Sequence, residues 1–264
     1  MSLMFEANHL SRVFGHGHSA KRAVDQVDFQ IREQEVVSLV GQSGCGKTAL
    51  AKLLLRLDTA SSGRLCFKGR DIAAERDVRK HFRQVQAVFQ DPFSAFNQFF
   101  TIRSQLESSF HLFEKKPSRA EMAERVDAAL LCVNIKPREI DGKYPFELSG
   151  GQMQRMLLAR IFIIRPEVLI ADEPTSMVDA CSRAGILDFL MKLKRELKMT
   201  IVFVTHDLGL ACYVSDTLYI MHEGKIVERG PPERVTGAPE SPVTRQLLDD
   251  IPDVHKDWLG RGTA

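Results

Sequence analysis

The chain has 264 residues, so it can bury a large core and fits one large domain or one domain carrying an inserted subdomain. Lys and Arg outnumber Asp and Glu by only 36 to 34, which is unlike the basic stripe of nucleic-acid binders, and we expect no nucleic-acid partner. The five cysteines form no C-x-x-C pair, which argues against a zinc site or a disulfide framework and favours a reduced, cytosolic chain.

The sequence has no pattern typical of a membrane-crossing segment. Its first residues lack the basic region and long apolar run of a signal peptide. The most apolar candidate, Leu157–Ile164, is interrupted by Arg160 and is too short to span a bilayer. We therefore expect a chain that does not cross a membrane by itself.

Short runs of β-branched and aromatic residues, bounded by Gly and polar residues, predict strands in both halves of the chain. These strands are Val24–Ile31, Val36–Val40, Arg64–Phe67, Val85–Phe89, Val168–Ala171, Ile201–Val204, Leu218–Met221 and Lys225–Glu228. Helical periodicity predicts helices at Gly46–Leu57, Ser118–Val133, Gly150–Ile164 and Ala180–Lys198. Strands followed by helices predict a mainly parallel sheet with crossover helices.

The predicted α/β pattern is interrupted between about Asp91 and Arg165, where the sequence is almost wholly helical. We predict one domain over residues 1–264, with an α/β core at 1–90 and 166–235, a helical insert at 91–165 and a C-terminal extension at 236–264. The extension contains a short amphipathic piece, Val243–Leu248, and a polar end that we expect to be poorly ordered.

A phosphate-binding loop follows the apolar strand Val36–Val40 and opens a helix, as this motif requires. Its glycines permit backbone angles that turn successive N–H groups toward a phosphate at the positive end of the helix. We predict that Lys47 reaches the β- and γ-phosphates and that the Thr48 hydroxyl ligates magnesium. The predicted nucleotide-binding residues here are Gly41, Gln42, Ser43, Gly44, Cys45, Gly46, Lys47, Thr48 and Ala49.

Two adjacent carboxylates, Asp172 and Glu173, follow the apolar strand Val168–Ala171. Ligands collect at the carboxyl ends of strands in open α/β sheets. Asp172 would hold magnesium, and Glu173 would polarise the water that attacks the γ-phosphate. An apolar run that ends in Asp-Glu is a weak signal alone, but the phosphate loop upstream strengthens it.

Two further polar residues follow predicted strands. His206 comes after Ile201–Val204, at the same sheet edge as the carboxylates, where it could hydrogen-bond the γ-phosphate, although a lone histidine at a strand end is usually structural. Gln90 follows Val85–Phe89 and could contact both the metal ion and the start of the helical insert.

These motifs, taken in order, resemble the motif set of the ATP-binding subunit of ABC transporters over nearly the whole chain. The segments that carry the resemblance are Gly41–Thr48, Gln90, Leu148–Gln152, Val168–Glu173, Ser176–Asp179 and His206. The resemblance implies a P-loop NTPase (RecA-like) core with a mainly parallel sheet, an antiparallel β subdomain and an inserted helical subdomain. It also implies a Mg²⁺-dependent ATPase in which Lys47, Glu173 and His206 are catalytic and Thr48, Gln90 and Asp172 hold the metal.

The resemblance makes Leu148–Gln152 the signature motif, whose residues Ser149, Gly150, Gly151 and Gln152 start a helix that binds the γ-phosphate of ATP held by the facing subunit. Ser149 is a good N-cap in its own right.

Two further site residues are implied by the resemblance. Phe14 would stack on adenine, although tyrosine is common at that place. Asp179 would contact the facing subunit.

Within the family, three segments are similar to the oligopeptide and dipeptide importer group. They are Val88–Asn97, Tyr144–Gly151 and Ser241–Leu248. The chain departs from that group at Gln98, Phe146 and Val243, and it lacks the cysteine cluster of some members, so no iron–sulfur cluster is expected.

The implied partners are a second ABC ATPase subunit in a homodimer or heterodimer, two membrane permeases and an extracytoplasmic substrate-binding protein, which would place the chain at the cytoplasmic face of the membrane. Three alternatives stay open: an oligosaccharide, nickel or opine cargo; a soluble ATPase that acts on DNA or ribosomes; and a regulatory subunit that binds ATP without hydrolysing it.

Overall fold

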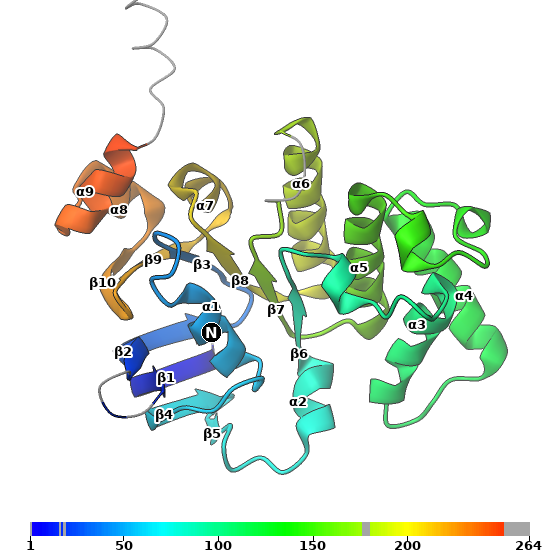
Figure 1. Cartoon of the computed structure of the whole chain (residues 1–264), viewed down its shortest axis with the longest axis horizontal. Coiled ribbons are helices and arrows are strands. Elements are labelled where there is room, and N and C mark those ends of the chain that lie inside the picture. The colour runs from blue at the N-terminus through cyan, green and yellow to red at the C-terminus, as the bar shows by residue number, and fades with distance from the viewer. Residues whose placement is uncertain (1, 16, 18–19, 176–179, 251–264) are drawn as a thin grey trace, which may run out of the picture.

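The computed structural model describes residues 2–15, 17, 20–175 and 180–250 (Figure 1). Its larger sheet has six strands in the order β10-β9-β3-β8-β7-β6, all parallel to their neighbours except β10, which is antiparallel to β9. Their bounds are Val36–Val40 for β3, Val85–Val88 for β6, Val168–Asp172 for β7, Thr200–Thr205 for β8, Thr217–His222 for β9 and Lys225–Gly230 for β10.

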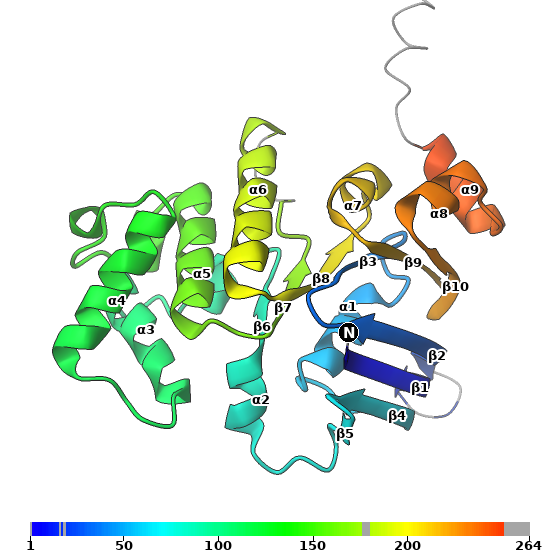
Figure 2. The same cartoon turned by 180° about the vertical axis from the view of Figure 1, so that it is seen from behind.

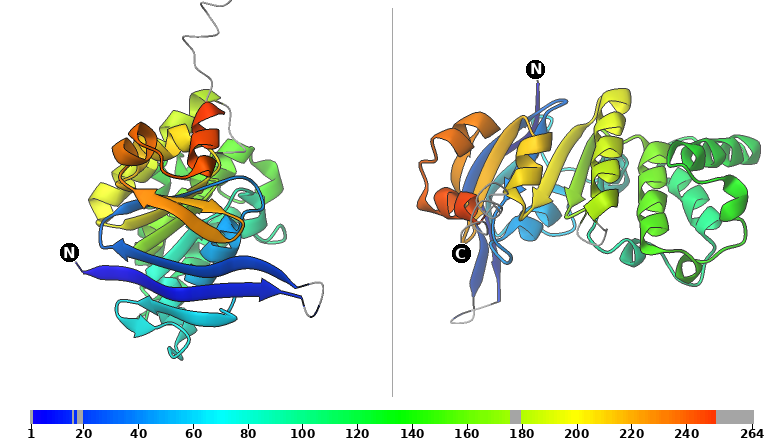
Figure 3. Two further views of the ribbon diagram at one scale, coloured as in Figure 1. Left: turned by 90° about the vertical axis from the view of Figure 1, so that its left-hand side faces the viewer. Right: turned by 90° about the horizontal axis from the view of Figure 1, so that it is seen from above.

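A second, wholly antiparallel sheet has four strands in the order β2-β1-β4-β5. Their bounds are Leu3–Phe14 for β1, Lys21–Arg32 for β2, Ser62–Phe67 for β4 and Arg70–Asp71 for β5. The left-hand view of Figure 3 shows β1 and β2 as a long ribbon running beneath the larger sheet.

The helices divide into three groups. The helices beside the larger sheet are α1 (Lys47–Leu54), α2 (Val78–Gln84), α6 (Ala180–Leu197) and α7 (Leu208–Val214). The helices of the helical segment are α3 (Ile102–Ser108), α4 (Arg119–Cys132) and α5 (Gly150–Ile164). This segment also contains the single 3-10 turns η2 (Phe93–Ala95), η3 (Ser109–Leu112), η4 (Pro137–Glu139) and η5 (Pro145–Glu147). The helices after the last strand are α8 (Pro232–Gly237) and α9 (Pro242–Asp249).

The helical segment and the C-terminal helices lie at opposite ends of the larger sheet, as the right-hand view of Figure 3 shows. Between them, α6 stands next to α5 and α7 stands beyond it (Figure 1 and Figure 2). Within the described residues, we find no helix with the length and apolar character needed to cross a bilayer.

The central strands β3, β7 and β8 are buried along their whole length, which explains why they read as nearly continuous apolar runs. Along β7, Leu169 and Ala171 belong to the core shared with α5 and α6, while Val168 and Ile170 belong to the core shared with α1 and the antiparallel sheet. Alternate residues thus serve two cores, and the strand is held from both sides.

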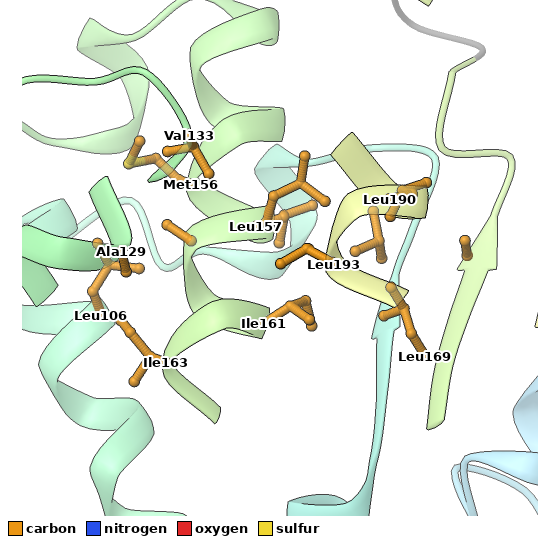
Figure 4. Packing of buried hydrophobic residues seen from close by; sticks show 14 of the residues in the cluster. Leu106, Ala129, Val133, Met156, Leu157, Ile161, Ile163, Leu169, Leu190 and Leu193 are labelled. Atoms are coloured by element: carbon orange, nitrogen blue, oxygen red, sulfur yellow. The ribbon is translucent and has the colours of Figure 1, made fainter. Parts of the chain in front are cut away.

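Helix α5 joins the helical segment to the sheet. Leu157 and Ile161 point toward α6 and β7, whereas Met156 and Ile163 point toward α3 and α4 (Figure 4). Helix α5 is therefore packed on two flanks, one against the sheet side and one against the rest of the helical segment.

Strand β1 is the main element that the sequence pattern did not predict. Its buried residues include the adjacent pairs Met4-Phe5 and Leu10-Ser11, and its register with β2 shifts at several bulges. Each bulge moves the alternation by one residue, so no period of two survives in the sequence.

The first predicted helix is shorter than expected. We predicted Gly46–Leu57, but α1 ends at Leu54, because Arg56 adopts a left-handed backbone with φ 56° that a helix cannot continue. The predicted amphipathic piece Val243–Leu248 is confirmed as part of α9, and the polar end after Asp250 lies outside the described residues.

Candidate functional site

Four parallel strands, β6, β7, β8 and β3, end at the same edge of the larger sheet, and each leads into a predicted site segment. These segments are Gln90 after β6, Asp172 and Glu173 at the end of β7, His206 after β8 and Gly41–Thr48 after β3. This edge is where ligands bind in open α/β sheets.

The loop after β3 is held against its neighbours so closely that two of its glycines cannot be replaced without movement. A Cβ atom built on Gly41 would lie 2.2 Å from the Met221 carbonyl oxygen. On Gly46, which has φ 113°, it would lie 2.0 Å from the Ala23 carbonyl oxygen. The backbone N–H of Gly224 also donates to the Cys45 carbonyl at 2.8 Å. The conformation of the loop is therefore fixed by this chain alone.

Lys47 is buried, with 5% of its surface exposed, and its ammonium group lies within the loop. Nζ donates to the carbonyl oxygens of Gly41 at 2.7 Å and Gln42 at 2.9 Å. Gly46, the N-cap of α1, has no side chain that could accept the first helical N–H groups. The free N–H groups and the ammonium together create a positive site for phosphate.

A cavity of about 680 Å³ lies over this loop and gathers predicted residues from distant parts of the chain. The predicted residues that line it are Phe14, Ser43, Gly44, Gly46, Lys47, Thr48, Ala49, Gln90, Asp172 and Glu173. This volume lies within the range of cofactor sites.

The cavity wall also contains Lys21, which the sequence pattern did not single out. Lys21 is the register partner of Phe14, a residue that is 41% exposed, across the pairing of β1 and β2. The Arg12 guanidinium lies 4.6 Å from the centre of the Phe14 ring. The sequence signal that could have indicated these cations is a basic residue two positions before Phe14, which is Arg12, and another at the start of the next strand, which is Lys21.

Thr48 and Asp172 both line the cavity, and the Thr48 hydroxyl lies close enough to the Asp172 carboxylate to favour its charged form. Burial raises the pKa of Asp172, and the hydrogen bond from Thr48 and the charge of Lys47 only partly offset that rise. Oxygen donors of this kind suit Mg²⁺, which usually binds one or two protein oxygens together with phosphates and waters. The donor set therefore fits the metal.

Glu173 is held by two neighbours in an uncommon backbone conformation. Its φ is 49°, its N–H donates to the Val204 carbonyl at 2.9 Å, and its Oε1 lies 2.8 Å from Nδ1 of His206. A non-glycine residue in this region costs about 1–3 kcal/mol and is typical of functional sites. The strained backbone and the contact with His206 hold Glu173 in the cavity lining, to which His206 itself does not belong.

The segment Leu148–Gln152 lies outside this cavity, at the start of α5. Ser149 is its N-cap in a capping box, because its Oγ accepts from Gln152 N–H at 3.3 Å while its own N–H donates to Gln152 Oε1 at 3.0 Å. A Cβ on Gly150 or Gly151 would meet no described atom within 4 Å beyond its chain neighbours and the helix backbone.

Glycine at the start of a helix costs free energy relative to alanine, and the described part of this chain gives Gly150 and Gly151 no packing reason. The open face at this helix start suits the close approach of a group from outside the chain. Asp179, the remaining predicted residue, lies outside the described residues.

Residues 24–176 match the family model described as ABC transporter. The chain belongs to the ABC transporter family. This ABC ATPase is 36% identical to the di/tripeptide transport ATP-binding protein DppF of Pseudomonas aeruginosa over 94% of its own length and 77% of that protein. It is 33% identical to the oligopeptide transport ATP-binding protein OppF of Bacillus subtilis over 97% of its own length and 84% of that protein.

Among solved structures, the dimeric ATP-binding cassette MJ0796 in a post-hydrolysis state with ADP and Pi is similar to this ABC ATPase. The TM-score is 0.78 and the identity 25%, over 87% of this chain and 99% of that one. The predicted P-loop α/β fold, ATP binding and ATPase activity are thereby confirmed.

Proposed function

We propose that this ABC ATPase is the ATP-hydrolysing subunit of an importer that takes up oligopeptides or dipeptides through partner permeases. The observation that carries the proposal is one cavity that joins the phosphate loop to Asp172 and Glu173, in a chain similar over nearly its whole length to ATP-binding proteins of peptide transport. The proposed ATPase activity rests on the residues of this cavity, and the proposed cargo rests on the similarity to peptide-transport proteins.

In this proposal, the loop N–H groups and Lys47 bind the phosphates, and Phe14 stacks on the base. Glu173 takes a proton from the attacking water, and the Glu173–His206 contact keeps that carboxylate oriented. Thr48, Gln90 and Asp172 would hold Mg²⁺, which when bound neutralises charge on the β- and γ-phosphate oxygens.

A second ATPase subunit completes each site. The exposed start of α5 at Ser149 donates to the γ-phosphate of ATP in the facing subunit, and Asp179 contacts that subunit. The dimeric state of the similar cassette supports this arrangement. The partner is an identical chain or a homologue.

The permeases dock beside Gln90, where the helical segment begins. Phe99 and Phe100 are 88% and 57% exposed there, and Phe146 is 68% exposed. The backbone N–H of Ile102 donates to the Lys143 carbonyl at 2.9 Å, which ties the two aromatic loops together. Exposed aromatic side chains gathered in this way are typical of a protein interface.

We infer that residues 91–165 move as a helical unit against the core when ATP is bound, so that the docked permeases change their access. The chain acts as a peripheral protein at the cytoplasmic face of the membrane, and an extracytoplasmic binding protein delivers the cargo.

The test is transport in proteoliposomes containing the ABC ATPase, its two permeases and its binding protein. We expect ATP-dependent uptake of labelled di- and oligopeptides, with phosphate release that stops when EDTA removes Mg²⁺. Uptake of an oligosaccharide, nickel or an opine without peptide uptake would rule out peptides as the cargo. Absence of Mg²⁺-dependent phosphate release from the intact complex would reject the catalytic roles.

A further inference from the structure

A second cavity, of about 380 Å³, lies where the end of α2 faces α4 and the end of α5. Three arginines line it, Arg83 from α2, Arg125 from α4 and Arg165 from the end of α5, and so do Phe113 and Phe162. It is separate from the nucleotide cavity, because the two cavities have no lining residue in common.

The aromatic rings hold two of these guanidinium groups in place. The Arg83 guanidinium carbon lies 4.3 Å from the centre of the Phe113 ring, and that of Arg165 lies 5.4 Å from the Phe162 ring. Arg83 Nη1 also donates to the Arg165 carbonyl at 3.2 Å. A guanidinium fixed in this way loses little further entropy when it binds an anion.

The carboxylates that act on these arginines are engaged elsewhere. Glu121, one helical turn before Arg125, accepts from the Ser118 N–H at 2.8 Å and from its hydroxyl at 2.9 Å. Glu167, which acts on Arg83, forms an ion pair with Lys68 and accepts from Gln84 at 2.7 Å.

In the part of the chain that the structure describes, none of the three arginines has a carboxylate within ion-pair distance. Burial lowers the pKa of Arg83, and the charge of Glu167 offsets only part of that fall. Arg125 and Arg165 are exposed, so a ligand can enter from solvent.

We propose that this three-arginine cavity binds a small phosphorylated anion. Planar guanidinium groups present paired N–H donors that match phosphate oxygens, and three arginines line a space large enough for one small ligand. Because Arg83 leads into β6 and Gln90 while Arg125 and Arg165 belong to the helical segment, the bound anion ties that segment to the core. The proposed anion binding does not depend on the proposed function, whereas its consequence for transport rests on that function.

The test is calorimetric titration of inorganic pyrophosphate into the full chain carrying Lys47→Ala, which weakens the phosphate loop as a competing site. We expect one binding site per chain in this background. Adding Arg125→Ala and Arg165→Asn should raise the dissociation constant for pyrophosphate at least tenfold. Asparagine is chosen at position 165 because it tolerates the left-handed backbone there, where φ is 52°. Arg125→Glu, a single change at an exposed position, should have the same effect.

The matched control adds Arg119→Ala and Arg138→Asn, which remove the same charge from exposed positions of the helical segment. Binding should be unchanged in it. No binding in the Lys47→Ala chain, an equal loss in the control, or binding of citrate without pyrophosphate would overturn the proposal. None of these outcomes concerns ATP hydrolysis by the wild-type chain, so they are separable from failure of the proposed function.

Discussion

The phosphate loop Gly41–Thr48 and the signature segment Leu148–Gln152 are both glycine-containing starts of helices, but their surroundings are opposite. Cβ atoms on Gly41 and Gly46 would clash with backbone carbonyls of this chain, whereas Cβ atoms on Gly150 and Gly151 would meet nothing within 4 Å among the described residues beyond their chain neighbours and the helix backbone. The first motif is shaped by its own chain, and the second is open to a partner.

The same contrast holds for the polar groups. Lys47 is buried and its ammonium group is hydrogen-bonded within its loop, while Ser149 is exposed and its hydroxyl accepts from Gln152 in the capping box. A phosphate site assembled from both motifs therefore needs a preformed half and a half delivered from outside. The predictions below test this division, beginning with the largest expected effect.

Glu173→Gln should lower the ATPase rate at least about 100-fold, because a glutamine cannot accept the proton of the attacking water. ATP binding should persist, since the phosphate loop is unchanged, and the chain should elute as an ATP-dependent dimer. Phosphate release and size-exclusion chromatography measure the two effects. Glu196→Gln, on the surface of α6, is the control, and an ATPase rate of Glu173→Gln equal to this control would remove Glu173 from catalysis.

Ser149→Arg should leave ATP binding within about threefold of the wild type but abolish dimer closure and hydrolysis, because a large cation blocks the helix start. Fluorescent nucleotide titration, sedimentation and phosphate release test these outcomes.

Ser118→Arg is the matched control, because Ser118 is also an N-cap in a capping box, at the start of α4. It separates loss of a helix cap from loss of the partner contact. If both variants lose hydrolysis equally, the signature segment has no special role in closure.

Gly46→Ala should abolish ATP binding and destabilise the chain by about 2–3 kcal/mol, since both φ 113° and the contact with the Ala23 carbonyl exclude a side chain. Denaturant unfolding and nucleotide titration measure the two effects. Gly44→Ala is an instructive comparison, because it shares a positive φ of 78° but has open space around it. Native stability in Gly46→Ala would contradict a loop fixed by its own chain.

Gly151→Ala should raise the free energy of unfolding by about 0.5–1 kcal/mol, because alanine is the better helix former and nothing described obstructs its methyl group. The ATPase rate should fall at the same time, as the methyl group meets the partner's nucleotide. Urea unfolding of the isolated chain gives the first quantity. A loss of stability would show that the glycine serves this chain's own fold after all.

The sequence predicted the larger sheet well, because strands buried on both faces give unbroken apolar runs that end in polar residues. It predicted α5 with the bounds that the structure has, since Ser149 and Arg165-Pro166 mark both ends. It missed β1, whose bulges break the alternation, and the short helices α2, α3 and α7. Such brief segments contain too few turns to show a helical period.

What the sequence determined by itself was chemistry: a phosphate loop, two carboxylates, a histidine and a signature segment in one order. These depend on short contiguous strings whose backbone requirements are local. Only the tertiary structure decided which of them meet. Parallel strands bring Gln90, Asp172 and Thr48 to one cavity, and the pairing of β1 with β2 adds Lys21 beside Phe14. The same packing leaves Ser149 outside the set of residues that line this cavity.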